Sequence, residues 1–328
     1  MKVGIEMLRD VARRAIARQG YEAADTEIIL EIIMYAQLRG NNQNVIKLLG
    51  PGMPANPEAG QIGVAKETKL SALLDGGWNQ GMVVMSRSCE IAIKKAKEHG
   101  FGIVGTRRTN SPTGAIGYYG RWIADEGLLG FVFSGSPELM AVYGSYEAFL
   151  GTNPLAIGIP TAGKPIVLDM ATAAIAWYGI HLANAEGKKI PEGVAYDRDG
   201  QFTTDPGQAL AGAIKAFGGF KGAALALIVE ILTRPLVGAT RDDDGRKTDW
   251  GNLIFAIDPE LLAENLESFQ AGVSDLLDRV KGLKRLPGVD EIPIPGERGD
   301  NYFDGVMAAG EIEIDEKVWR ELDAVASG

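Results

Sequence analysis

The sequence predicts an α/β protein with helical ends and a glycine-rich central sheet. Apolar residues recur at helical spacing near both ends of the chain, whereas residues 101–170 contain short apolar runs separated by Gly, Pro and Asn. Glycine accounts for 43 of the 328 residues. That is nearly twice the usual share of about 7%, and it favours tight turns and close backbone approaches. At about 150 residues per domain, the length predicts roughly two domains.

The N-terminal region predicts two helices followed by a linker. Periodic apolar residues indicate a first helix over residues 3–16. A second helix is expected over residues 23–39, with Asp25–Thr26 as its cap and Gly40 at its end. The Pro- and Gly-rich run at 50–63 is the first candidate linker.

The rest of the chain predicts a strand-rich middle followed by helices. Strands are expected over 101–108, 127–135, 154–160 and 165–170, and helices over 88–99, 171–185, 221–232 and 258–281. The polar run 241–252 is predicted to be an exposed loop. Residues 312–326 indicate a strand-turn and an amphipathic helix with Trp319, Leu322 and Val325 facing inward.

Charge and composition exclude several classes of function. The formal net charge of -10 opposes nucleic-acid binding, which needs clustered cations. With Cys89 as the one cysteine and only His99 and His181 as histidines, neither a disulfide framework nor a metal centre is expected. Cys89 is expected to be a buried, inert thiol. No apolar run reaches the roughly 18 residues of a membrane helix, and the start lacks a signal-peptide core. A cytoplasmic setting is therefore expected.

Two familiar-looking motifs are set aside because their context is wrong. GFGIVG at 100–105 matches a dinucleotide fingerprint, but that fingerprint needs a strand before it and a helix after it. Here a predicted helix precedes the run and a predicted strand follows. The acidic run at 197–200 could open a calcium loop, yet the twelfth position is Gln208 rather than Glu, so a β-turn is expected.

Ordered Gly-rich segments carry the functional signal. They read TNSPTGAIGYYG (109–120), GTNP (151–154), LDMAT (168–172), GGFKG (218–222) and IPGER (294–298). This set, over roughly residues 1–325, resembles the type 2 malate/L-lactate dehydrogenase family of NAD(P)-dependent oxidoreductases. That family includes ureidoglycolate, sulfolactate and diketogulonate dehydrogenases, and reductases of cyclic imines such as Δ1-piperideine-2-carboxylate.

The resemblance implies a non-Rossmann cofactor-binding domain with a central mixed sheet over residues 71–298. It also implies a helical substrate and dimer domain built from residues 1–70 with 299–328, a homodimer and a small-molecule substrate. The cofactor contacts that it implies are Pro112, Thr113, Gly114, Ala115, Ile116, Asn153, Asp169, Met170, Ala171, Phe220, Lys221, Ile294, Pro295, Gly296 and Glu297. Either NADP(H) or NAD(H) fits, and we lean to NADPH because reductive imine chemistry in related enzymes commonly uses it.

The departures from the family pattern bear on proton transfer. Members usually read G-H-D-S-H-G where this chain reads GNNQNV at 40–45. Asn44 therefore replaces the histidine thought to transfer the proton, and Gln43 replaces its serine partner. Lys47 stands near the usual arginine and is a candidate contact for the substrate carboxylate. Pro112 replaces a second histidine, next to the substrate.

Loss of these histidines favours reduction of C=N over C=O, because a protonated imine needs no further proton donor whereas a carbonyl does. The leading hypothesis is an NAD(P)H-dependent reductase of a C=N bond beside a carboxylate, with Asn44 and Gln43 bonding the substrate. A 2-hydroxy-acid dehydrogenase is the first alternative, with Tyr118, Tyr119 or a held water as proton relay. A dinucleotide-binding protein without catalysis is the second.

Overall fold

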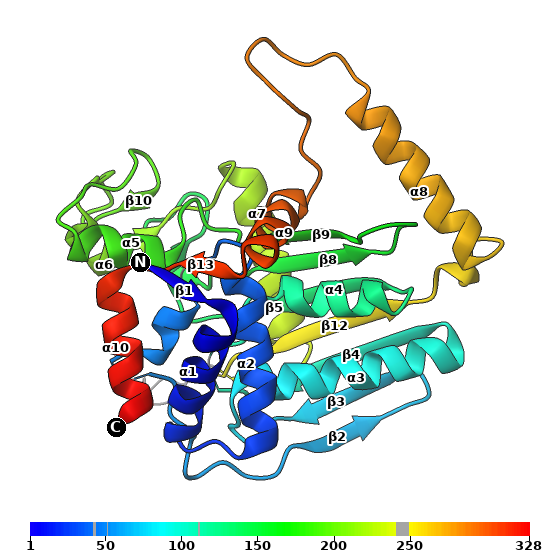
Figure 1. Ribbon diagram of the computed structural model, residues 1–328, viewed down its shortest axis with the longest axis horizontal. Coiled ribbons are helices and arrows are strands. Elements are labelled where there is room, and N and C mark those ends of the chain that lie inside the picture. The colour runs from blue at the N-terminus through cyan, green and yellow to red at the C-terminus, as the bar shows by residue number, and fades with distance from the viewer. Residues whose placement is uncertain (42–43, 51, 111, 241–248) are drawn as a thin grey trace.

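The computed structural model describes residues 1–41, 44–50, 52–110, 112–240 and 249–328. Within these ranges a seven-stranded mixed sheet forms the centre, in the order β2-β3-β4-β12-β5-β8-β9 (Figure 1). Its strands are β2 (Gly63–Glu67), β3 (Ser71–Asp75), β4 (Phe101–Arg107), β5 (Leu129–Ser134), β8 (Leu155–Ile159), β9 (Ile166–Met170) and β12 (Asn252–Ile257). The α/β class and the central mixed sheet are thereby confirmed.

One pair in this sheet is parallel and the other pairs are antiparallel. Strands β3 and β4 run parallel because helix α3 (Gly81–His99) crosses between them. Gly100, with a φ of 81°, ends α3 directly before β4. The run 100–105 therefore follows a helix and opens a strand, the reverse of a dinucleotide fingerprint, as expected. The acidic run at 197–200 forms the expected turn, in which Gly200 N donates to Asp197 O at 3.2 Å.

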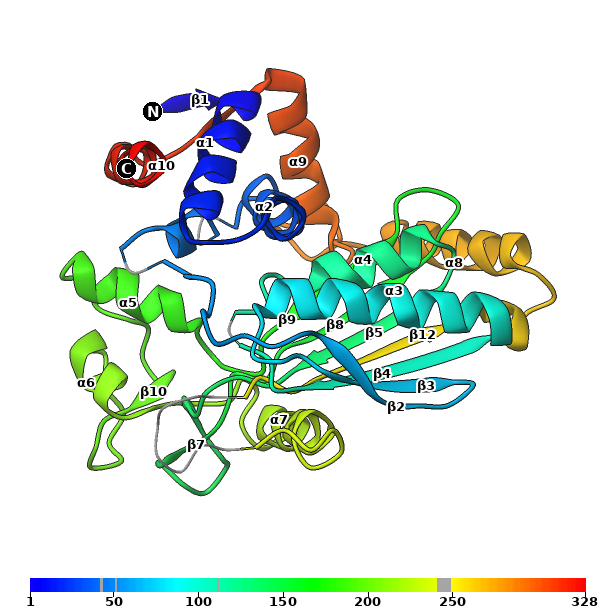
Figure 2. The same cartoon turned by 90° about the horizontal axis from the view of Figure 1, so that it is seen from below.

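Helix α4 (Gly117–Asp125) lies on the same face of the sheet as α3, and α7 (Phe220–Thr233) lies on the other face (Figure 2). The sequence did not predict α4, because Gly117 and Gly120 indicate turns when read locally. In the fold they form its contact surface. A Cβ on Gly158 of β8 would lie 1.8 Å from the carbonyl oxygen of Gly120, so this approach requires a glycine at position 158.

The two chain ends pack together beside the sheet (Figure 2). Strand β1 (Lys2–Gly4) pairs antiparallel with β13 (Glu311–Glu313). Around this pair lie α1 (Ile5–Arg18), α2 (Ala23–Gln37), the 3-10 turn η1 (Val45–Leu48), α9 (Glu297–Ala309) and α10 (Glu316–Ser327). On α10, Leu322 is buried and Trp319 and Val325 pack against the core, as predicted.

One hydrophobic core connects these helices with the large sheet. It runs without a break from Leu8 of α1 and Ile29 of α2 to Val104 of β4. A second core, around Met140 and Ile180, lies under a smaller sheet of order β10-β11-β6-β7. The elements of this region are β6 (Met140–Ala141), β7 (Ala148–Leu150), β10 (Ala195–Tyr196), β11 (Ala213–Ile214), α5 (Trp177–Ala185) and α6 (Pro206–Ala211). The division at residues 70 and 299 stays a prediction.

Several predicted boundaries are wrong for identifiable reasons. Helix α2 begins at Ala23, with Glu22 at the N-cap position, so Asp25–Thr26 lies inside its first turn. Helix α3 begins at Gly81 rather than at residue 88, because the Gln80 side chain caps it. Helix α5 begins at Trp177 rather than at residue 171, because the preceding segment bonds to its neighbours: Thr172 N donates to Thr152 O at 2.9 Å.

The C-terminal half departs from the predictions at three more places. The helix expected over 258–281 is a 3-10 turn, η2 (Pro259–Leu261), followed by α8 (Leu266–Lys281), which Asn265 caps and which extends away from the body (Figure 1). Helix α9 was not predicted. Of the expected exposed loop 241–252, residues 241–248 lie outside the described residues, and Asp249 and Asn252 are buried. None of the described helices is both long and apolar enough to span a bilayer.

A buried ion pair on α7 yields a stability prediction. The Arg234 and Glu230 side chains are only 5% and 7% exposed, and their Nε and Oε1 atoms lie 2.5 Å apart. Replacing Glu230→Ala leaves the Arg234 charge buried without this carboxylate, and we expect a loss of about 3–5 kcal/mol in the free energy of unfolding. Urea unfolding followed by circular dichroism measures it.

The matched control is Arg320→Ala, which removes an exposed pair with Glu316 on α10. It should change the unfolding free energy by no more than about 0.5 kcal/mol. Equal effects of the two substitutions would show that the α7 pair has no special importance.

Candidate active site

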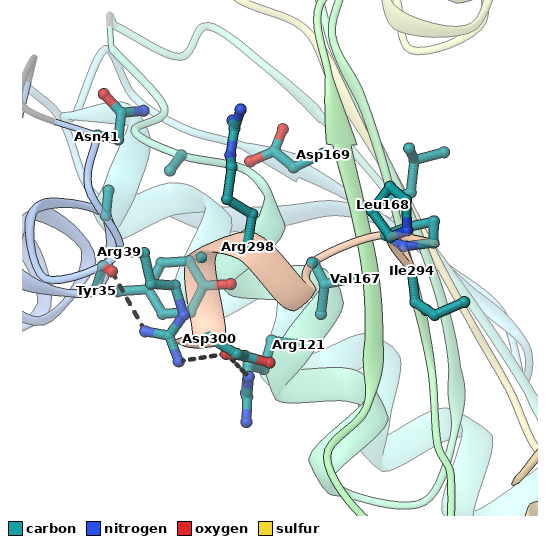
Figure 3. A pocket seen from close by; sticks show the side chains of 16 residues that line it. Tyr35, Arg39, Asn41, Arg121, Val167, Leu168, Asp169, Ile294, Arg298 and Asp300 are labelled. Carbon is teal, nitrogen blue, oxygen red and sulfur yellow. Dashed lines mark hydrogen bonds and ion pairs between the residues drawn. The ribbon is translucent and has the colours of Figure 1, made fainter. Parts of the chain in front are cut away.

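A cavity of about 650 Å³ opens where α2, α4, β9 and α9 meet. Three of the predicted cofactor motifs, 109–120, 168–172 and 294–298, contribute residues to its wall. Its lining residues are Tyr35, Ala36, Arg39, Asn41, Ala115, Arg121, Val167, Leu168, Asp169, Pro293, Ile294, Pro295, Gly296, Arg298, Gly299 and Asp300 (Figure 3). Three arginines and two aspartates are among them, so the wall carries one net positive charge when both aspartates are ionised.

The loop 112–116 enters the cavity wall through its backbone and Ala115. Thr113 is buried, and its hydroxyl shares a hydrogen bond with that of Ser134 at 3.2 Å. Gly114 has a φ of 75°, and a Cβ there would lie 2.5 Å from Ile32 of α2. Ile116 is also buried. The loop is therefore held by its inward side chains, and Ala115 is the one that faces the cavity.

Pro112 lies at the base of this loop, and its carbonyl oxygen accepts a hydrogen bond from Gln80 Nε2 at 2.8 Å. The Tyr119 hydroxyl donates to the Thr113 carbonyl at 2.9 Å, and this side chain is fully buried. Burial raises the pKa of Tyr119 well above its ordinary value. Tyr119 thus supports the loop, and it is a weaker acid than a free phenol.

Asp169 is the carboxylate at the centre of the cavity wall. Its Oδ2 accepts a hydrogen bond from Gly117 N, the first residue of α4, at 2.9 Å. The Asp169 side chain is exposed to the cavity that it lines. Burial raises the pKa of Asp169 to about 6, against the opposing effect of the Gly117 hydrogen bond. Such a group can accept hydrogen bonds from hydroxyls at neutral pH.

Arg39 and Arg121 converge on Asp300 at one side of the cavity, whereas the Arg298 side chain extends away from that group (Figure 3). Asp300 of α9 accepts from Arg121 Nη1 at 2.7 Å and from Arg39 Nη2 at 3.3 Å. The Arg39 guanidinium also lies 4.0 Å from the centre of the Tyr35 ring. Arg298 also lines the cavity. Unlike Arg39 and Arg121, it makes no side-chain hydrogen bond or ion pair with another described residue.

Three residues of the turn before α9 line the cavity, and the fourth, Glu297, does not. Ile294, Pro295 and Gly296 line the cavity, and Gly296 has a φ of 90°. Glu297 instead binds Lys281, at 2.6 Å from its Oε1, and accepts from Ile294 N at 3.0 Å. The Lys281 ammonium holds the pKa of Glu297 below its ordinary value. Glu297 therefore closes the turn and ties it to α8.

The remaining cofactor motifs form a second group beside the cavity. Thr172 N donates to Thr152 O at 2.9 Å, and Phe217 N donates to Thr172 O at 3.0 Å. These bonds bring the segments of Met170, Ala171, Asn153, Phe220 and Lys221 together. Phe220 and Lys221 are exposed at the start of α7. None of these five residues is in the lining of the cavity, so Asp169 joins the two groups.

The Asn153 side chain is buried and hydrogen-bonded to helix α7, so it does not face the cavity. It is completely buried with a φ of 37°, and its Nδ2 donates to Ala226 O at 2.9 Å and to Glu230 Oε2 at 2.8 Å. Through these bonds it fixes helix α7, whose first residues are Phe220 and Lys221. Its contribution to a cofactor site comes through the position of that helix.

The segment that departs from the family pattern lies in and before η1. Asn44 is buried, its Nδ2 donates to Asn41 O at 3.0 Å, and its Oδ1 accepts from Lys47 Nζ at 3.1 Å. Burial lowers the pKa of Lys47 to about 8. The ammonium lies 5.4 Å from the centre of the Tyr178 ring of α5. Gln43 lies outside the described residues.

Tyr118 projects into an aromatic cluster on the other side of α2. Its ring meets Tyr35 and Tyr119 edge-on, each at 5.4 Å between centroids, and it lines a separate cavity of about 240 Å³. Burial raises the pKa of Tyr118. The predicted relay residues Asn44 and Tyr118 are thus on different elements, and no contact between them is present.

Sequence reasoning missed the charged side of the cavity: Arg39, Arg121, Arg298 and Asp300. Arg39 directly precedes Gly40 and Arg298 directly follows the IPGE turn, and this adjacency is the one available signal. His181 packs edge-on against Trp177 at 4.8 Å, and His99 ends α3. Cys89 is fully buried, which raises its pKa and agrees with an inert thiol.

The site fits a nicotinamide dinucleotide in three respects. Glycine-rich turns let the backbone approach a ligand, and Asp169 offers an acceptor for a ribose hydroxyl. Arg298 offers a cation that is not paired with any described side chain. Among the described residues, no group of three or more His, Cys, Asp or Glu side chains could hold a metal ion.

The sequence is similar to known dehydrogenases over most of its length. The sequence model described as "Malate/L-lactate dehydrogenase" matches residues 3–323. The L-sulfolactate dehydrogenase of Methanocaldococcus jannaschii is 35% identical over 94% of this chain and 91% of that protein. A (2R)-3-sulfolactate dehydrogenase (NADP(+)) of Chromohalobacter salexigens is 34% identical over 74% of this chain and 72% of that protein.

Among solved structures, the Δ1-piperideine-2-carboxylate reductase of Pseudomonas syringae superposes with a TM-score of 0.84. It is 27% identical, and the match covers 99% of each chain. Over almost its whole length this chain is therefore similar to proteins named as dehydrogenases or as a reductase.

The raised pKa of Asp169 yields a pH-dependent stability prediction. Since its native pKa of about 6 lies above the ordinary value of 3.8, the native state holds this proton more tightly than the unfolded chain. The ionised carboxyl therefore destabilises the native state above pH 6, and this effect disappears as pH falls below 4. Without cofactor, Asp169→Asn should raise Tm by a few degrees at pH 7.5 and lose that advantage toward pH 4.

Thermal unfolding between pH 4 and 8 measures this, with Asp323→Asn as the matched loss of an exposed carboxylate on α10. The same Asp169 variant should bind dinucleotide more weakly at pH 7.5, because an amide is a poorer acceptor than a carboxylate. A stability change independent of pH would contradict the assigned pKa.

Proposed function

Because this chain belongs to the malate/L-lactate dehydrogenase family, we propose that it transfers hydride between a nicotinamide dinucleotide and C2 of a small 2-oxo or 2-hydroxy acid. The observation that carries this proposal is the cavity of about 650 Å³. One side of it holds the cofactor-motif residues Ala115, Asp169 and 294–296, and the other holds arginines in excess over carboxylates. A cationic surplus beside a dinucleotide site suits an anionic substrate.

Each part of the site has a physical task in this reaction. A bound nicotinamide supplies or accepts the hydride, which is chemistry that the protein side chains do not provide. Arg298 and the loop 112–116 bind and orient the reactants, and Asp169 accepts hydrogen bonds from hydroxyls. Lys47, which Asn44 holds, places an ammonium in the segment where family members usually have histidine. The structure therefore supports C=O reduction more than the sequence alone did.

Reduction of a C=N bond is the second candidate. The replacement of both family histidines by Asn44 and Pro112 favours it, since an iminium nitrogen arrives protonated. The structural likeness to a piperideine carboxylate reductase supports the same chemistry. The homodimer and the cytoplasmic location that were expected from the sequence stay predictions.

The deciding assay follows NADPH and NADH absorbance with oxaloacetate, sulfopyruvate and pyruvate, each with and without excess methylamine, and with a cyclic imine carboxylate. We expect turnover of the oxo acids without amine. Oxaloacetate and sulfopyruvate should have a higher kcat/KM than pyruvate, because their second anionic group meets the positive wall. Turnover only with amine, or only of the cyclic imine, would select C=N reduction. Cofactor binding without any turnover would indicate the non-catalytic alternative.

Preference for NADPH is proposed on the basis of Arg298. An arginine near the ribose accommodates a 2′-phosphate in dinucleotide sites, and the Arg298 guanidinium makes no hydrogen bond or ion pair with another described residue. Arg298→Ala should raise the KM for NADPH about 10- to 100-fold, the effect of losing about 1.5–3 kcal/mol of charge-assisted hydrogen bonding. The KM for NADH should change much less.

The matched control is Arg285→Ala, outside the cavity, where the arginine contacts the carbonyl of Asp290. Both KM values should stay unchanged in this variant. An equal rise for NADH and NADPH in Arg298→Ala would remove the argument for a 2′-phosphate contact.

A further inference from the structure

We propose that Lys47 donates the proton in carbonyl reduction and that Asn44 is the residue that positions it. This assignment rests on the proposed hydride-transfer function and deepens it. The sequence suggested a different role for Lys47, as a contact for the substrate carboxylate. The geometry of η1 points to proton transfer instead.

The local backbone brings the two side chains together. In a 3-10 turn residues i and i+3 eclipse one another, and Asn44 and Lys47 stand in this relation at η1. The Asn44 amide has a defined orientation, because its Nδ2 donates to Asn41 O at 3.0 Å. Its oxygen therefore faces Lys47 Nζ, at 3.1 Å. Asn41 itself lines the large cavity, so this arrangement adjoins the candidate active site.

The surroundings make the Lys47 ammonium a stronger acid than an ordinary lysine. Burial disfavours the charged form and lowers the pKa of Lys47 to about 8, from 10.5. Asn44 faces it from its own turn and Tyr178 faces it from α5. Burial also raises the pKa of Tyr178, so this phenol stays neutral. From α1, α2 and α10, which also pack against η1, no described charged side chain contributes to the shift.

The proton and electron balance is complete with this donor. Hydride adds to C2 of the oxo acid, the π electrons of the carbonyl pass to its oxygen, and that oxygen takes a proton from Lys47 Nζ. Lys47 is left as a neutral amine and regains a proton from water. Oxidation of the hydroxy acid runs through the same groups in reverse. The proton comes from the ammonium whose position the Asn44 side chain fixes.

Tyr118, the other relay residue considered, is less suited to this step. Its pKa is raised above that of a free phenol, and its ring is packed among Tyr35, Tyr119 and Trp122. A donor with a pKa near the working pH combines full protonation with a favourable transfer. Lys47 meets this condition and Tyr118 does not.

The test compares Lys47→Arg with Lys47→Met, using oxaloacetate and a cyclic imine carboxylate as paired substrates. An arginine keeps the positive charge but cannot release its proton. Both variants should therefore lose at least about 100-fold in kcat for oxaloacetate, in the range that general acid catalysis contributes. The imine should lose far less, so the ratio of oxo-acid to imine turnover should fall. Retained far-UV circular dichroism and cofactor binding show that each variant is folded, and Lys66→Met on exposed β2 is the control.

The pH dependence of kcat distinguishes proton transfer by Lys47 from a purely structural role, because a structural residue would not shift it. Because the donor must be protonated, oxo-acid reduction should decline as pH rises through about 8. Asn44→Ala removes an acceptor that stabilises the ammonium, so this decline should move to lower pH. In Lys47→Met it should be absent.

The outcomes separate the two proposals. An unaltered enzyme that reduces neither oxo acids nor imines overturns the proposed function, and the donor assignment with it. An active enzyme in which Lys47→Arg retains kcat overturns the donor assignment alone and returns Lys47 to carboxylate binding. Equal losses for both substrates, or an unshifted pH profile in Asn44→Ala, would also overturn it.

Discussion

The close approach of α4 to the sheet is the constraint on which the candidate site depends. Gly158 of β8 lies against the backbone of Gly120 in α4, and a Cβ on Gly158 would lie 1.8 Å from the Gly120 carbonyl oxygen. That approach places the first amide of α4, Gly117 N, on the carboxyl of Asp169. The loop 112–116, Ala115 and Arg121 are then fixed by the same helix. Replacement of Gly158 by a larger residue would move three parts of the cavity wall together.

Local sequence patterns predicted the helices and strands whose buried residues recur at regular helical or strand spacing. Residues of α1, α7 and α10 were found in this way, as was β4 after Gly100. Helix α4 was missed because its glycines serve tertiary contact, and a local reading assigns them to turns. Helix α5 starts late because Thr172 bonds to a segment twenty residues away in sequence. Such long-range hydrogen bonds leave no local pattern in the chain.

The candidate site was predictable in part, and mainly through resemblance. Motifs identified Asp169 and 294–296, which the structure brings to one cavity. They could not reveal that Asn153 anchors α7, or that Glu297 binds Lys281. Nor could they show the bond between Asn44 and Lys47, which depends on the 3-10 geometry of a short turn. Arg39, Arg121 and Asp300 come from three elements, and only their assembly makes a charged wall.

Burial shifts the pKa values of Asp169 and Lys47 in opposite directions for the same physical reason. It disfavours charge, so it raises the pKa of Asp169 to about 6 and lowers that of Lys47 to about 8. Between these values the carboxylate is ionised and the ammonium is protonated, so the acceptor and the donor are both in their working forms near neutral pH. An imidazole donor would instead lose its proton near pH 6.5. If Lys47 is the donor, loss of the family histidines moves the upper limit of oxo-acid reduction to more alkaline pH and leaves the reaction itself intact.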